Sequence, residues 1–144
     1  MARVSTYLNF ERETEAAFCF YRGVFGTEFS MPLMRFGDGP PCPGQSLSPE
    51  DAQLVLHVEL PILGGHVLMG TDAATSMGFT LRQGNNSYLN LEPDTRGETE
   101  RLFAALAEGG EVETPLQEMF WGGYYGRVKD RFGVQWMFNC MSKG

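Results

Sequence analysis

The stretch Tyr7-Leu8-Asn9-Phe10-Glu11 decides the fold, because it returns as Tyr88-Leu89-Asn90-Leu91-Glu92 at an offset of 81 residues (88 − 7). Each copy is followed by the same two landmarks in the same order, Glu-Thr-Glu at 13–15 and 98–100 and Pro-Leu at 32–33 and 115–116. A repeat of this length is longer than a solenoid unit and shorter than an ordinary domain. The sequence therefore predicts two copies of one supersecondary unit that complete a single core.

The spacing of apolar residues assigns elements to each copy. Alternation from Val4 to Phe10 predicts a half-buried strand, and apolar residues at helical spacing then predict a helix that ends at Gly26. Three further strands follow in each copy, so both copies are βαβββ units and the fold class is α+β. The expected elements are a helix at 13–25 and strands at 27–36, 53–59 and 66–71 in the first copy, and a strand at 86–91, a helix at 95–108 and strands at 111–117, 124–130 and 133–139 in the second.

The two units are expected to form one domain over residues 1–144, with modules at about 1–72 and 86–144 and a connector at 73–85. Residues 37–49 are rich in Gly, Pro and Ser and have no counterpart in the second copy, so they are interpreted as an inserted loop. Loops of this length often act as lids over a site.

Composition narrows the classes of partner. The formal net charge is −7, which disfavours binding to nucleic acid. Because no apolar run approaches the roughly 20 residues of a membrane span, and the N-terminus runs directly into a strand pattern, we expect no membrane association and a cytoplasmic location. Three widely spaced cysteines, Cys19, Cys42 and Cys140, fit reduced thiols, and Cys19 and Cys140 are expected to be buried structural residues.

Two stretches resemble a known family. Tyr7-Leu8-Asn9-Phe10 followed by Phe20-Tyr21-Arg22-Gly23-Val24-Phe25-Gly26, and the closing segment from Trp121 to Trp136 with its Asp130-Arg131-Phe132-Gly133, resemble the PhnB-like branch of the vicinal oxygen chelate superfamily. That superfamily includes glyoxalase I, bleomycin-resistance proteins and extradiol dioxygenases. The resemblance implies a glyoxalase-like incomplete barrel of two βαβββ repeats. PhnB-like sequences are sometimes labelled demethylubiquinone methyltransferases, but nothing in this sequence resembles a glycine-rich S-adenosylmethionine site.

The resemblance also implies where a metal would bind. Enzymes of the superfamily hold a divalent ion with His, Gln or Glu from the first and last strands of each unit, and these positions fall here at Ser5, Met69, Asn86 and Met137. Hydroxyl, thioether and amide side chains are poor ligands for such ions, which prefer imidazole or carboxylate. We therefore expect no metal and no cofactor.

The hairpin that carries both histidines offers an alternative metal site. If Glu59 paired with His66, then His57, Glu59 and His66 would lie on one face of a two-stranded ribbon. The other interpretation of these residues is a polar stripe that faces solvent.

The face that carries the former ligand positions is expected to line a cleft between the repeats. Amides, phenols and thioethers suit a neutral or aromatic polar compound and offer no evident base, nucleophile or Lewis acid. The same amides could instead satisfy one another in a polar core. Arg127 could pair with a substrate carboxylate or form a surface ion pair. The predicted cleft residues are Ser5, Tyr7, Asn9, Met69, Thr71, Asn86, Tyr88, Asn90, Arg127, Gln135, Met137 and Asn139.

Three functions follow as hypotheses. The first is a metal-free protein that binds a small molecule; the second is a metal-dependent lyase, isomerase or dioxygenase with a non-standard site; the third is sequestration of a drug or toxin. Relatives in the superfamily commonly dimerise, so a homodimer is expected, and the apolar Phe79, Phe120 and Trp121 are consistent with one.

Overall fold

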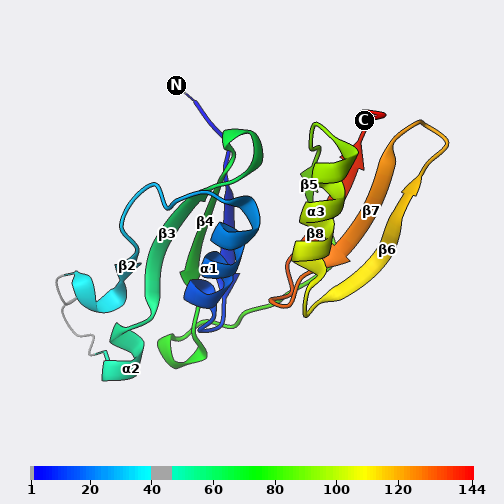
Figure 1. Ribbon diagram of the computed structural model, residues 1–144. Helices are drawn as coiled ribbons and strands as arrows, with labels where there is room; N and C mark the ends of the chain where they lie inside the picture. The colour runs from blue at the N-terminus through cyan, green and yellow to red at the C-terminus, as the bar shows by residue number, and fades with distance from the viewer. Residues whose placement is uncertain (1, 40–46) are drawn as a thin grey trace. The chain divides into compact units, whose positions relative to one another are not determined.

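The computed structural model describes residues 2–39 and 47–144, and the chain divides into two compact units. Unit 1 ends at Arg82 and unit 2 begins at Gln83. Within the described residues each unit contains an open four-stranded sheet and one long helix (Figure 1). The α+β class and the two βαβββ repeats predicted from the sequence are thereby confirmed.

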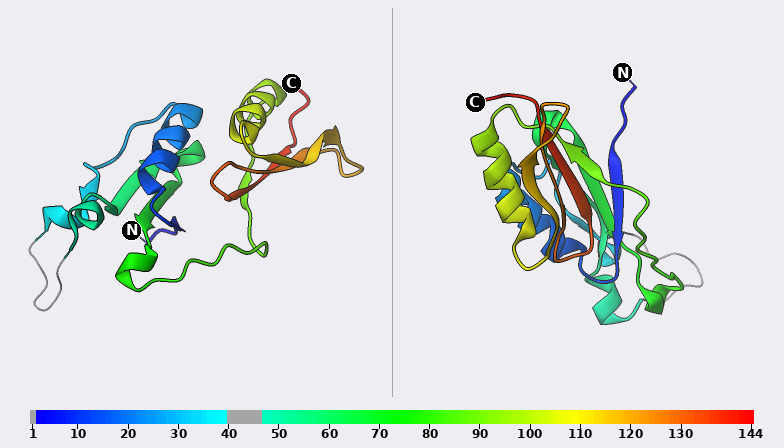
Figure 2. Two further views of the ribbon diagram at one scale, coloured as in Figure 1. Left: turned by 90° about the horizontal axis from the view of Figure 1, so that it is seen from below. Right: turned by 90° about the vertical axis from the view of Figure 1, so that its right-hand side faces the viewer.

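In unit 1 the strand order is β1-β4-β3-β2, with β1 parallel to β4 and the other pairs antiparallel. The helix α1 packs against β3 and β4 (Figure 2). The elements are β1 (Thr6–Phe10), α1 (Thr14–Phe25), β2 (Met34–Arg35), β3 (Val55–Pro61) and β4 (Val67–Asp72), with short helices η1 (Phe36–Asp38), α2 (Pro49–Ala52), η2 (Leu63–Gly65) and η3 (Thr75–Met77).

The N-terminus of α1 is fixed by a buried carboxylate. The backbone N–H and the hydroxyl of Thr14 donate to Asp72 Oδ1 at 3.0 and 2.7 Å, and the Val55 N–H donates to Asp72 Oδ2 at 2.8 Å. Asp72 is 3% exposed, so these bonds supply the partners that a buried charge requires. The helix ends at Gly26, whose φ of 65° is a left-handed conformation that glycine adopts without strain.

Unit 2 repeats this plan with the strand order β5-β8-β7-β6. Thr14 is the first residue of α1 and Thr99 is the fourth residue of the corresponding helix, and both are fully buried, so each copy of Glu-Thr-Glu places a buried threonine in the first turn of a helix. Trp136 and Phe138 are fully buried on the helix-facing side of the sheet. The elements are β5 (Leu89–Leu91), α3 (Arg96–Ala107), β6 (Glu111–Glu118), β7 (Tyr124–Lys129) and β8 (Gln135–Cys140).

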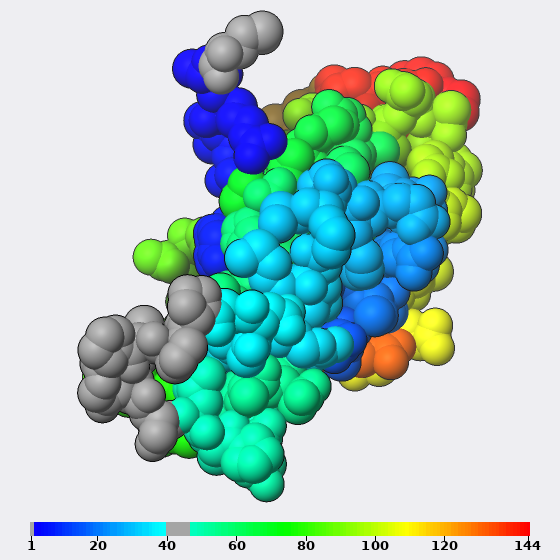
Figure 3. All heavy atoms as spheres, turned by 90° about the vertical axis from the view of Figure 1, so that its left-hand side faces the viewer, coloured from blue at the N-terminus to red at the C-terminus, as the bar shows by residue number. Residues whose placement is uncertain are grey.

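Two strands are shorter than predicted. The strand expected at 27–36 is reduced to β2, because Pro32 has no N–H to donate and the preceding residues keep isolated bonds, such as Ser30 N–H to Glu59 O at 3.2 Å. This segment lies on the surface of unit 1 (Figure 3, light blue to cyan). β5 begins at Leu89 and not at residue 86, because Leu89 pairs with Trp136 and residues before Tyr88 lie beyond the start of β8.

The loop expected at 37–49 begins within η1 and ends at the start of α2. Its residues 40–46 lie outside the described residues, so the expectation that this loop acts as a lid stays a prediction. Cys42 falls there too. Cys140 is buried as expected, but Cys19 is exposed, because it lies on the side of α1 that faces away from the sheet. No helix in the described part of the chain is both long enough and apolar enough to cross a membrane.

Candidate functional site

One face of the unit 1 sheet carries polar side chains, and we call it the unit 1 polar face. The strand β4 lies between β1 and β3. Its residue Met69 pairs with Tyr7 of β1 and with Glu59 of β3, and its residue Thr71 pairs with Asn9 of β1. The Ser5 hydroxyl contacts Met69 Sδ at 3.7 Å. The six residues of the face that the register or a bond fixes are Tyr7, Asn9, His57, Glu59, Met69 and Thr71.

A chain of three side chains crosses this face. The Tyr7 hydroxyl lies 3.0 Å from His57 Nδ1, and His57 Nε2 lies 2.9 Å from Glu59 Oε2. The Tyr7 and His57 rings also stack, with centroids 5.6 Å apart. The bond from His57 holds the pKa of Glu59 below its ordinary value, so Glu59 is a carboxylate acceptor. Burial raises the pKa of Tyr7, so its phenol is neutral at physiological pH.

The unit 2 polar face is built around Tyr88. Its hydroxyl donates to Glu113 Oε1 at 2.9 Å and accepts from Gln135 Nε2 at 3.0 Å and from Arg127 Nη1 at 3.4 Å. The bond to Glu113 is the main cause that raises the pKa of Tyr88. Arg127 also donates to Thr114 Oγ1 at 3.0 Å and lies over the Tyr88 ring at 5.6 Å. Arg127 is therefore held within this cluster.

The remaining predicted residues of unit 2 are placed around this cluster. Met137 lies between Asn90 and Arg127 in the register, and Asn90 and Asn86 are exposed. The Asn139 side-chain oxygen accepts from Trp121 Nε1 at 3.0 Å. Gln135 is only 7% exposed, so its amide serves the interior of the cluster.

Three ionisable side chains on these faces are missing from the predicted cleft residues. Glu59 and His57 enter the unit 1 polar face from β3, and Glu113 enters the unit 2 polar face from β6. Apart from Arg127, the predicted cleft residues came from the first and last strands of each unit, so those on the strands between them were missed. The sequence does show the alternation of His57 with Glu59 and of Glu111 with Glu113, but the register that brings Glu113 to Tyr88 cannot be deduced from it.

The register that the alternative metal site requires on the histidine hairpin does not occur. Glu59 pairs with Met69 and not with His66, whose Nε2 lies 2.8 Å from Thr6 Oγ1. Thr6 alternates with Tyr7 along β1, so His66 is turned to the opposite side from His57. Among the described residues no group of three His, Cys, Asp or Glu side chains is placed to hold a metal ion.

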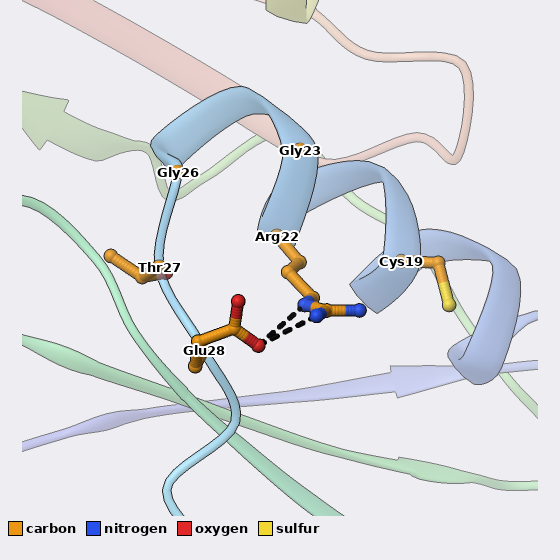
Figure 4. Close-up of a pocket in the computed structure, with 6 residues that line it drawn as sticks. All are labelled: Cys19, Arg22, Gly23, Gly26, Thr27 and Glu28. Atoms are coloured by element: carbon orange, nitrogen blue, oxygen red, sulfur yellow. Dashed lines mark hydrogen bonds and ion pairs between the residues drawn. The ribbon is translucent and has the colours of Figure 1, made fainter.

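A surface depression elsewhere in unit 1 is lined by the end of α1 and the residues after it, and has a volume of about 310 Å³ (Figure 4). Arg22 and Glu28 form an ion pair across it at 2.6 Å. Because none of the predicted site residues lines it, it is not part of either polar face. The lining residues are Cys19, Arg22, Gly23, Gly26, Thr27 and Glu28.

A protein-family model described as 3-demethylubiquinone-9 3-methyltransferase matches residues 2–138. The chain belongs to this family. Its neighbours include solved structures of the glyoxalase, bleomycin-resistance and dioxygenase superfamily, so the PhnB-like vicinal oxygen chelate fold inferred from the repeat is confirmed.

Three relatives of the family extend over nearly the whole chain. Protein YjdN of Escherichia coli is 30% identical and the match covers 97% of this chain and 96% of YjdN. The crystal structure of PA1353 from Pseudomonas aeruginosa is 32% identical, with a TM-score of 0.81 over 97% of this chain and 98% of that one. A Bacillus cereus structure described as a putative 3-demethylubiquinone-9 3-methyltransferase, PhnB protein, is 25% identical, with a TM-score of 0.73 over 96% of this chain and 99% of that one.

The metal that the superfamily implies does not fit the residues at its expected positions. The Ser5 hydroxyl donates to the Met69 sulfur, and a thioether is a soft, weak ligand for these metals. Asn86 is exposed and lies beyond the start of β8, and Met137 offers a second thioether. This donor set lacks the imidazole and carboxylate groups that such metals require.

Proposed function

We propose that this member of the family is a metal-free protein that binds a small, neutral or aromatic polar compound on its polar faces. The observation that carries the proposal is the chemistry of the four family ligand positions, which are Ser5, Met69, Asn86 and Met137. They offer hydrogen bonds and polarisable surface but little affinity for a hard or borderline cation.

The arrangement of the polar faces supports a polar organic ligand. Each face presents a tyrosine whose hydroxyl is oriented by defined partners, His57 in unit 1 and Glu113 with Gln135 in unit 2. Tyrosine offers flat apolar area beside a polar tip, which suits an aromatic compound. The charged groups on both faces are paired with neighbouring side chains, so binding a neutral compound leaves no buried charge without a partner.

The proposal contains no methyl transfer. The sequence has no pattern that resembles a glycine-rich S-adenosylmethionine site, and family membership alone does not determine chemistry. The metal-dependent alternative gains no support either, since His66 does not join His57 and Glu59.

A thermal-shift screen of the full chain against planar, uncharged polar compounds tests the proposal. A ligand that binds the folded chain raises its melting temperature in proportion to the logarithm of concentration. We expect at least one such compound, with a shift that Tyr7→Phe or Tyr88→Phe reduces. Tyr124→Phe is the matched control, because Tyr124 pairs with the buried Cys140 and packs under Arg96 at 4.7 Å. A panel without any stabiliser, or an equal loss in Tyr124→Phe, would contradict the proposal.

A further inference from the structure

The two repeated tyrosines differ in what their hydroxyls can do. The Tyr88 oxygen donates one hydrogen bond and accepts two, so its capacity is used within its own cluster. The Tyr7 hydroxyl lies against an imidazole, with the Thr71 side chain as a further hydrogen-bond partner, and Tyr7 is 49% exposed. The two tyrosines therefore differ in their partners, because Tyr7 is bonded to a base and Tyr88 to a carboxylate.

The carboxylate fixes the tautomer of the imidazole. Glu59 is ionised and can only accept, so the proton in its 2.9 Å bond belongs to His57 Nε2. A neutral imidazole carries one proton, which makes Nδ1 an acceptor. The Tyr7 hydroxyl must then donate to Nδ1 across the 3.0 Å contact. The Thr71 side chain is a further hydrogen-bond partner of this oxygen, and the acceptor capacity that remains is what a proton from a second molecule would use.

We propose that Tyr7, His57 and Glu59 form a proton relay, in which Tyr7 accepts a proton from an O–H or N–H group of a bound small molecule while its own proton passes to His57. This inference deepens the proposed function and rests on it for its natural ligand. One O–H bond of Tyr7 breaks as another forms, the ligand becomes an anion and His57 becomes an imidazolium. Glu59 stabilises that cation through Nε2, so it is a positioning residue that acts through His57.

The surroundings of His57 suit this role. Glu59 is the anion nearest its ring, and Arg3 approaches Glu59 Oε1 at 4.0 Å from the N-terminal segment. The Ser30 hydroxyl donates to the same oxygen at 3.4 Å. Met34 of β2 pairs with His57 in the register, and the Tyr7 side chain reaches the imidazole from β1, so neither of these two residues adds a charge beside it.

The first test reads the tautomer directly. Long-range ¹H–¹⁵N NMR of the full chain at pH 8.5 resolves both histidines, and His66→Gln assigns them. We expect the proton of His57 on Nε2. A proton on Nδ1 would overturn the relay, because Tyr7 would then face a donor.

The second test measures the proton transfer with p-nitrophenyl acetate as the probe. Tyr7 Oη attacks the acetyl carbon, its proton passes to His57 Nδ1, and p-nitrophenolate leaves. Peptide mass spectrometry should show acetylation of Tyr7 ahead of Tyr88, with the rate followed as a function of pH. We expect His57→Gln to lower this rate on the order of 100-fold, and His66→Gln to leave it unchanged.

Two further readouts keep the relay falsifiable. Glu59→Gln should slow acetylation and shift its pH profile while leaving the melting temperature close to that of the parent chain. An unchanged rate in His57→Gln, or an unchanged profile in Glu59→Gln, would overturn the relay. Both tests need no natural ligand, so the relay can fail while compounds still bind, and binding can fail while Tyr7 remains reactive.

Discussion

Single residues with buried charge hold each unit together. Asp72 accepts three hydrogen bonds from α1 and β3 while it is 3% exposed. In unit 2 the buried Asp130 accepts from Trp136 Nε1 at 2.9 Å and from the N–H groups of Phe132 and Val134. Both carboxylates join a sheet to the segment beside it, so each acts as a structural residue and not as a catalytic one.

Replacing Asp72 by Ala should lower the free energy of unfolding by about 3 kcal/mol, because three donors lose a charged partner in the interior. Urea unfolding followed by circular dichroism measures this change, with the denaturant slope held constant. Asp94→Ala is the control, since Asp94 is exposed, and it should change stability by less than about 0.5 kcal/mol. Equal effects in the two variants would contradict this assignment.

The Tyr88 cluster makes a prediction about alkaline pH. The hydrogen bond to Glu113 raises the pKa of Tyr88 above the ordinary value of 10.0, so the folded chain holds this proton longer than the unfolded chain does. Its contribution to stability is therefore complete below pH 10 and is lost as the pH rises through the folded pKa. Glu113→Gln should lower the pKa of Tyr88 in a spectrophotometric titration.

Tyr88→Phe identifies which ionisation belongs to Tyr88. If Glu113→Gln left that ionisation in place or moved it upward, the assigned cause of the shift would be wrong.

The residue patterns predicted the polar faces only in part. The period of two placed Tyr7, Asn9, Met69 and Thr71 together, and the structure has them on one side of the unit 1 sheet. The alternation along each strand could not predict that His57 is the partner of Tyr7. The two residues are 50 positions apart in the sequence, and their contact depends on the order and register of the strands that carry them.

At the scale of elements, the contact between α1 and its sheet is tightest at Gly70. A Cβ built at this position would lie 2.6 Å from Phe18 Cε1, whereas one at Gly23, inside α1, would meet nothing within 4 Å. Glycine is therefore required at residue 70 for the close packing of α1 on β4. At residue 23 there is room for a side chain.

Gly70→Ala should destabilise the chain by roughly 1–3 kcal/mol through overpacking. Gly23→Ala should stabilise it by up to about 1 kcal/mol, because alanine loses less backbone entropy in a helix. Thermal and urea unfolding should therefore show a lower free energy of unfolding for Gly70→Ala and a higher one for Gly23→Ala. A stabilising Gly70→Ala would show that α1 is not packed against β4 as described.

Elements whose apolar residues recur at a clear helical spacing were predicted well. Both ends of α1 and of α3 lie within one residue of the predicted ends. β2 was overestimated because apolar composition at 27–36 does not reveal whether a partner strand is in reach. Pro32 was the visible warning, since it removes a donor from any ladder.

For the whole molecule, the repeated sequence and the repeated topology agree. The same βαβββ order, the same parallel pairing of first and last strands and a buried threonine in the first turn of the helix occur in both units. The fold was predictable because a repeat supplies two independent copies of each signal. The chemistry was less predictable, since it depends on residues that differ between the copies.

Metal analysis of the full chain, purified without chelators or affinity metals, tests the central claim most directly. Because Ser5, Met69, Asn86 and Met137 fall where the superfamily resemblance expects metal ligands, elemental mass spectrometry should find zinc, nickel, manganese and iron each well below one equivalent per chain. One equivalent of any of them, retained through dialysis, would contradict the account.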